Sequence, residues 1–166
     1  MYAPIQAMPN TSRIWIYQSN RELKEGDEQF IIETLKDFCS RWAAHGNDLQ
    51  TSFDIAHHRF IIFAVNEQAG SPSGCSIDSS THIIKKIEQG LNVDFFNRSE
   101  IAFLEDGLVQ IYSLTNLKKL FEARTLNENS VALNTLVATL GEWRNQSTMK
   151  VKDGWLKRYI PKVQVA

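Results

Sequence analysis

The pattern of apolar and polar positions first predicts three strands. Residues 13–18 are apolar on both faces, which is typical of a fully covered strand, and we place them centrally in a sheet. Residues 51–57 alternate, and residues 59–65 are apolar at nearly every position. We expect these two to form a hairpin with a tight turn at His57 and His58. Because neither residue favours such a turn, one long bent strand is the alternative.

Two further apolar runs, residues 100–105 and 108–114, flank Asp106 and Gly107. An Asp-Gly pair between apolar runs predicts a second hairpin, because both residues tolerate the left-handed backbone of a tight turn.

Apolar residues at three- and four-residue spacing predict four helices, over residues 27–44, 79–89, 115–124 and 131–144. Asp78 or Ser79 is expected to cap the second helix, and Gly90 to end it. The beginning of the fourth, residues 130–133, fits a strand equally well.

The elements up to residue 105 follow the order strand, helix, strand, strand, helix, strand. This is the βαββαβ order of ferredoxin-like sandwiches. We therefore predict an α+β fold with an antiparallel or mixed sheet, an extra hairpin strand and C-terminal helical additions. Residues 1–11 are expected to be a flexible lead-in, and residues 12–166 to form a single domain of ordinary size.

Composition says more about where the protein resides than about what it does. The 166 residues are 43% hydrophobic and 22% charged, with a formal net charge of −1, which gives no overall attraction to nucleic acid or anionic membrane. No apolar run approaches the roughly 20 residues that span a bilayer. Two cysteines and no secretory signal in the first ten residues indicate reduced thiols. We expect a cytoplasmic protein without membrane segments.

The richest candidate chemistry lies in residues 70–80, a Gly/Ser loop that follows the apolar run 60–65 and opens a helix. Free N–H groups at a helix start attract anions and lower the pKa of a nearby thiol. This predicts a site for a small anionic ligand, with Cys75 as a reactive thiolate assisted by His82. The candidate binding residues are Gly74, Ser76, Asp78, Ser79 and Ser80. An ordinary connection with a helix cap is the alternative interpretation.

Other chemistry receives no support from the residues. Gly70 and Gly74 are separated by three residues and Cys75 stands where a P-loop lysine would be, so Walker-type ATP hydrolysis is not predicted. Cys75, Asp78 and His82 lack a fourth ligand and any recognised metal-site spacing. We predict no metal and no cofactor, and the sequence leaves open whether the protein is an enzyme.

The last segment is basic and aromatic, with residues that suit a nucleic-acid contact: Lys150, Lys152, Trp155, Lys157, Arg158, Tyr159 and Lys162. The alternative is an amphipathic closing segment whose two aromatic rings lie on the body of the protein while the cations stay in solvent. The balanced charge of the chain favours this alternative over nucleic-acid binding.

Three strings resemble a family of small uncharacterised bacterial proteins, often labelled "ABC transporter ATPase": SRIWIYQS at 12–19, RFIIFAV at 59–65 and SGCSIDSS at 73–80. The resemblance extends over most of the chain after residue 11. It implies a bacterial, cytoplasmic protein and transfers no catalytic residues.

Three functions remain open from the sequence. The leading hypothesis is a non-catalytic cytoplasmic domain that binds a partner or forms a homodimer, through an exposed sheet face or the segment with Trp155 and Tyr159. The second is a small enzyme or anion-binding protein that uses residues 70–80. The third is nucleic-acid binding through the basic C-terminus.

Overall fold

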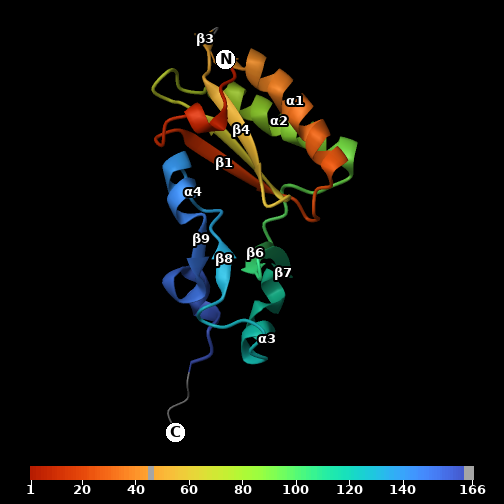
Figure 1. Cartoon of the computed structure of the whole chain (residues 1–166), viewed down its shortest axis with the longest axis vertical. Helices are drawn as coiled ribbons and strands as arrows, with labels where there is room; N and C mark the ends of the chain where they lie inside the picture. The colour runs from red at the N-terminus through yellow and green to blue at the C-terminus, as the bar shows by residue number, and fades with distance from the viewer. Residues whose placement is uncertain (45–46, 163–166) are drawn as a thin grey trace. The chain divides into compact units, whose positions relative to one another are not determined.

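A computed structural model describes residues 1–44 and 47–162, which divide into two compact units (Figure 1). The first unit comprises Met1–Asn97 and Val137–Asn145, and the second comprises Arg98–Leu136 and the segment from Gln146 onward. Each unit combines helices with an antiparallel sheet, so the α+β class is confirmed. We expected one domain over residues 12–166; since two units are found, each is described by itself.

The first unit is built on a three-stranded antiparallel sheet with the strand order β1-β5-β4. Its strands are β1 (Arg13–Gln18), β4 (Thr51–Ala56) and β5 (Phe60–Val65). β5 lies in the centre and is buried at all six positions. The prediction that β1 is central is wrong. β1 keeps several half-exposed side chains, whereas the uniformly apolar β5 takes the position with a neighbour on each side.

The hairpin between β4 and β5 is confirmed, including its tight turn at His57 and His58. Both histidines have left-handed backbones, with φ of 53° and 51°, and the N–H of Arg59 donates to the carbonyl of Ala56 at 3.0 Å. Such angles are unfavourable for residues with a side chain. The ring of His58 is held by a contact of 2.8 Å between its Nδ1 and Oε1 of Glu28.

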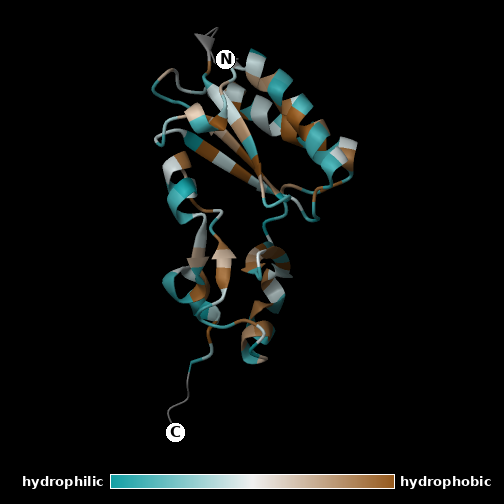
Figure 2. Ribbon diagram, in the orientation of Figure 1, coloured by the Kyte–Doolittle hydropathy of each residue, from teal (hydrophilic) through white to brown (hydrophobic). Residues whose placement is uncertain are grey.

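Two helices, α1 (Glu25–Arg41) and α2 (Gly74–Leu91), lie side by side over the sheet (Figure 1). Hydrophobic and hydrophilic positions alternate around α1 in Figure 2, and the hydrophobic side carries Ile31, Leu35 and Cys39, which are fully buried. These side chains join Phe63 of β5 and Ile84 of α2 in one core. The predicted α1 therefore exists, with its start two residues earlier. A two-residue ribbon follows it, formed by β2 (Ala43–Ala44) and β3 (Asn47–Asp48).

The end of α2 differs from the prediction. The helix continues through Gly90 to Leu91, and Asn92 ends it in the left-handed conformation, with φ 51° and ψ 52°. Asparagine is the side-chain-bearing residue that accepts this position most readily. Gly90 has another role, because a Cβ there would lie 3.0 Å from the ring of Phe30 on α1. The absence of a side chain at Gly90 lets the two helices approach closely.

The N-terminal segment and α4 (Leu140–Gln146) also pack within the first unit. Met8 follows a single turn of 3-10 helix (Ile5–Ala7) and is 2% exposed, and the N–H of Ala3 donates to the carbonyl of Thr51 at 2.9 Å. Residues 1–11, expected to be a flexible lead-in, thus make defined contacts with the sheet.

The second unit contains a four-stranded antiparallel sheet with the order β7-β6-β8-β9. The strands are β6 (Glu100–Glu105), β7 (Leu108–Ser113), β8 (Val131–Leu133) and β9 (Thr148–Lys150). One short helix and three 3-10 turns accompany them: α3 (Leu117–Glu122), η2 (Leu114–Asn116), η3 (Val151–Asp153) and η4 (Trp155–Tyr159). Phe103, Leu117 and Leu156 form the centre of its core. The hairpin at Asp106 and Gly107 is confirmed, with φ of 50° and 82°.

The ferredoxin-like order does not produce a ferredoxin-like sheet in the described residues. β6 was expected to complete the sheet of β1, β4 and β5, but it pairs with β7 and β8. The Asp-Gly turn joins β6 to β7, and β8 occupies the other side of β6, so β6 has no side left for the first sheet.

The helix predicted over residues 131–144 is wrong, and the strand alternative for its beginning is confirmed as β8. Leu136, one of the apolar residues whose spacing predicted this helix, is 72% exposed. Asn134 Oδ1 accepts from the N–H of Leu136, and a carboxylate oxygen of Glu142 accepts from the N–H of Thr139 at 2.9 Å. These side chains bond to the backbone in a non-helical course, and the helix begins only at Leu140.

Candidate functional site

The loop of residues 70–80 is shorter than expected, because α2 begins at Gly74 rather than at Ser79. Ser73 is the cap: its Oγ accepts from the N–H of Ser76 at 3.2 Å, and its carbonyl accepts from the N–H of Ile77 at 3.0 Å. The next amides lie inside the helix, where each bonds to the carbonyl four residues earlier. Asp78 and Ser79 are therefore not caps.

The serine hydroxyls of this segment also have partners. Ser76 Oγ donates to the carbonyl of Ser73 at 2.8 Å, Ser79 Oγ to that of Cys75 at 2.9 Å, and Ser80 Oγ to that of Ile77 at 2.6 Å. Ser76 and Ser80 are buried against the core. In this arrangement each hydroxyl donates its proton to a backbone carbonyl in or just before the first turns of α2.

The structure does not bring Cys75 and His82 together. Both side chains are exposed on α2, as is that of Asp78. Seven residues of α-helix separate the two Cα atoms by about 10 Å along the axis, whereas a nucleophile and its base must approach to about 3 Å. Within residues 1–44 and 47–162, no group of three or more His, Cys, Asp and Glu side chains is placed to hold a metal ion.

The basic C-terminal segment folds back onto its own unit. Leu156 is fully buried, and Trp155 and Tyr159 pack against the core with their ring centroids 6.3 Å apart. Lys157 and Arg158 are exposed, and the guanidinium of Arg158 lies 5.6 Å from the centre of the Trp155 ring. This arrangement agrees with the amphipathic closing segment.

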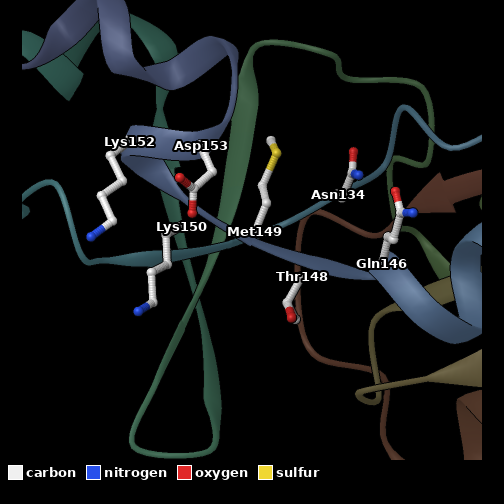
Figure 3. A pocket seen from close by; sticks show the side chains of 7 residues that line it. All are labelled: Asn134, Gln146, Thr148, Met149, Lys150, Lys152 and Asp153. Atoms are coloured by element: carbon white, nitrogen blue, oxygen red, sulfur yellow. The ribbon is translucent and has the colours of Figure 1, made fainter.

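A depression of about 440 Å³ lies along β9 (Figure 3), lined by Asn134, Gln146, Thr148, Met149, Lys150, Lys152 and Asp153. Figure 3 shows Lys150 and Lys152 extending to one side of Met149, with the amides of Asn134 and Gln146 on the other. From the sequence, the two lysines were expected only as part of a nucleic-acid segment. The depression gives no signal in the sequence, since Asn134 and Gln146 come from separate parts of the chain.

The backbone pairing shows which groups of β9 are directed outward. Asn134 N–H donates to the carbonyl of Ser147 at 2.8 Å, and Val151 N–H to that of Ser130 at 2.9 Å. Since antiparallel pairs alternate, the N–H and C=O groups of Thr148 and Lys150 are directed away from β8.

The opposite edge of the same sheet is β7, which contains no charged residue. Leu114 N–H donates to the carbonyl of Ser99 at 2.7 Å, so by the same alternation the N–H and C=O groups of Val109, Ile111 and Ser113 are directed away from β6. No strand of the described residues pairs with this side of β7. The hydroxyl of Tyr112 donates to a carboxylate oxygen of Glu105 at 3.0 Å. Burial of the hydroxyl is the larger cause and this hydrogen bond the smaller cause of a raised pKa of Tyr112.

The two units differ in charge. The second unit has nine Lys and Arg against six Asp and Glu, whereas the first has nine against thirteen. The nearly neutral total of −1 therefore conceals a basic second unit and an acidic first unit.

Known protein families, curated proteins and solved structures were compared with this chain, and none of the three comparisons finds a match. Among the described residues, no helix combines the length and the apolar character needed to cross a bilayer.

Proposed function

We propose that the protein is a non-catalytic cytoplasmic binding protein that forms a homodimer by pairing β7 with β7 of a second copy. The observation that carries this proposal is the uncharged, unpaired outer edge of β7. Exposed strand edges are usually protected by charge, proline or a covering segment. The other edge strands of the two larger sheets carry Arg13, Asp54 and Lys150, so β7 is the exception among the described residues.

The sequence of β7 suits pairing with itself. In an antiparallel pair with its two-fold axis at Ile111, this residue faces its own copy. Val109 then faces Ser113, and Gln110 faces Tyr112, each across the two copies. No like charges meet, and the outward N–H and C=O groups of Val109, Ile111 and Ser113 all find partners. A heterologous partner would not need this self-complementarity.

The non-catalytic part of the proposal is supported by the start of α2. The N–H of Ser76 is bonded to the Oγ of Ser73, and the hydroxyls of Ser76, Ser79 and Ser80 are bonded to backbone carbonyls. An anion there would have to displace these bonds. His82, the base expected from the sequence, lies about 10 Å from Cys75 along the axis of α2, too far to take its proton.

Gln110→Lys tests the dimer. Gln110 is exposed, and a lysine there would place two like charges near the two-fold axis, as natural sheet edges do to prevent pairing. We expect the dimer dissociation constant, measured by sedimentation equilibrium, to rise at least about ten-fold, which corresponds to ~1.4 kcal/mol. Thr125→Lys is the matched control, because it adds the same charge to an exposed loop of the same unit.

Ile111→Pro provides a second variant. Its N–H is directed away from β6, so proline would remove a donor of the dimer without removing a bond of the β6–β7 hairpin. A wild-type protein that stays monomeric at the highest accessible concentration would refute the dimer. Equal dissociation constants for Gln110→Lys and Thr125→Lys would place the contact elsewhere.

A further inference from the structure

We propose that the depression along β9 binds a small molecule that carries two or more anionic oxygen groups, such as phosphates or carboxylates. This goes beyond the proposed dimer, since the depression belongs to one chain and lies at the opposite edge of the sheet. Its volume of about 440 Å³ falls within the range of small-molecule sites.

The cations of the depression are available to an anion. Neither Lys150 nor Lys152 forms an ion pair with any residue in the described part of the chain. The ammonium of Lys152 donates to Oδ1 of Asn129 at 3.0 Å, a neutral partner that orients the amine and leaves its charge uncompensated. Lys150 is exposed and extends to the same side of Met149 (Figure 3). Two such amines can be shared by two anionic groups of one ligand.

Neutral donors complete the lining. Thr148, Asn134 and Gln146 line the same depression, and their side chains carry a hydroxyl and two amide groups. Groups of this type bond to anionic oxygens without the desolvation cost of a further charge. The second unit also carries an excess of Lys and Arg, which raises the local concentration of anions.

Two residues limit the site. Asp153 is the acidic group in the lining and repels an anion. Met149 forms an apolar wall, and it packs so closely on Gly154 that a Cβ at this glycine would lie 2.5 Å from the Met149 sulfur. We therefore expect a small ligand, because a larger one would bring its anionic groups close to the carboxylate of Asp153.

Titration of the full ¹⁵N-labelled chain with inorganic pyrophosphate, and separately with citrate, tests the proposal by NMR. We expect at least one of them to shift the backbone signals of residues 148–153 and the side-chain NH₂ signals of Asn134 and Gln146. Saturable, localised shifts from pyrophosphate alone would identify phosphate chemistry, and from citrate alone carboxylate chemistry. Absence of localised shifts with both probes would refute the site.

Matched variants separate a site from general charge attraction. The double variant Lys150→Met/Lys152→Met is expected to weaken binding about ten-fold, the sum of two exposed charge contacts. Lys118→Met/Lys119→Met removes the same charge from α3 and should leave the affinity unchanged. Asp153→Asn should tighten binding several-fold. Equal losses in the two double variants would overturn the proposal.

Two further measurements complete the test. Gln110→Lys, which is designed to separate the dimer, should bind the probe as the wild type does, so failure of the dimer and failure of this site are distinguishable. If a single-stranded oligonucleotide binds more tightly than either probe and shifts Trp155 and Lys157 rather than the depression, the basic segment binds nucleic acid and the small-anion proposal is wrong.

Discussion

The two cysteines show how strongly the environment of a residue sets its chemistry. Cys39 is completely buried on α1, and this burial raises the pKa of its thiol to about 12. Cys75 is exposed in the first turn of α2. Only a thiolate attacks a disulfide reagent, so the two residues should differ sharply in the native protein.

We therefore expect an aromatic disulfide reagent at about pH 8, near the ordinary thiol pKa, to label one thiol rapidly in the native protein and two after unfolding. Cys75→Ser should abolish the rapid phase, and Cys39→Ala should leave it unchanged. Rapid labelling of two thiols in the native chain would contradict the burial of Cys39. A labelling rate that already reaches its plateau well below pH 8 would revive the thiolate hypothesis for Cys75.

The candidate site at the start of α2 depended on the position of one cap. Ser73, Asp78 and Ser79 are all good capping residues, and the sequence does not distinguish between them. The structure uses Ser73, whose Oγ accepts from the N–H of Ser76, and the hydroxyls of Ser76, Ser79 and Ser80 bond to carbonyls of the same segment. Apolar spacing fixes where a helix faces the core, but it leaves a helix start uncertain by several residues.

At the level of elements, α1 and α2 meet where Gly90 faces the ring of Phe30. Alanine at Gly90 would improve helix propensity but would bring its Cβ to 3.0 Å from that ring. Gly26 has nothing within 4 Å of the corresponding position. Each glycine is second from one end of its helix. Comparing alanine substitutions at the two positions therefore separates the effect of helix propensity from the effect of packing against Phe30.

We expect Gly26→Ala to raise the free energy of unfolding by about 0.5 kcal/mol, and Gly90→Ala to give a smaller gain or a loss. Urea denaturation of both variants, alone and with Phe30→Ala, measures the difference. Removing the ring should make the two alanine substitutions equivalent. Equal gains while Phe30 is present would show that the helix contact does not constrain Gly90.

Local elements were more predictable than their partners. The hairpins at His57-His58 and Asp106-Gly107 follow from apolar runs on each side of a short turn, and both are present. The assignment of β6 to a second sheet depends on contacts with β8, about 30 residues away, which local spacing does not encode. The depression along β9 was not predictable for the same reason, since its amides meet only after β8 and β9 pair.

For the whole molecule, the two edges of the second sheet have different characters. The outer side of β7 offers backbone groups and uncharged side chains, whereas β9 contains Lys150 and is followed closely by Lys152. Hydrogen bonds between strands depend little on ionic strength, but attraction between small ions and exposed lysines is screened by salt. The salt concentration should therefore distinguish the β7 dimer from anion binding along β9.

Raising the NaCl concentration from about 0.05 M to about 0.5 M should leave the dimer dissociation constant within about two-fold and weaken pyrophosphate or citrate binding by about ten-fold or more. Sedimentation equilibrium and NMR titration of the same preparation measure the two constants. A dimer that dissociates with salt would indicate contact between the acidic and basic units of different copies instead of β7 pairing.

The strand order β1-β5-β4 also has a consequence for the nascent chain during translation. About 40 residues lie between β1 and its partner β5, and at roughly 5–20 residues per second their synthesis takes about two to eight seconds. During translation β1 therefore leaves the ribosome seconds before β5 and has no strand to pair with in that interval. In this interval its apolar side chains need protection from aggregation, by a chaperone or by early packing of α1 against β1.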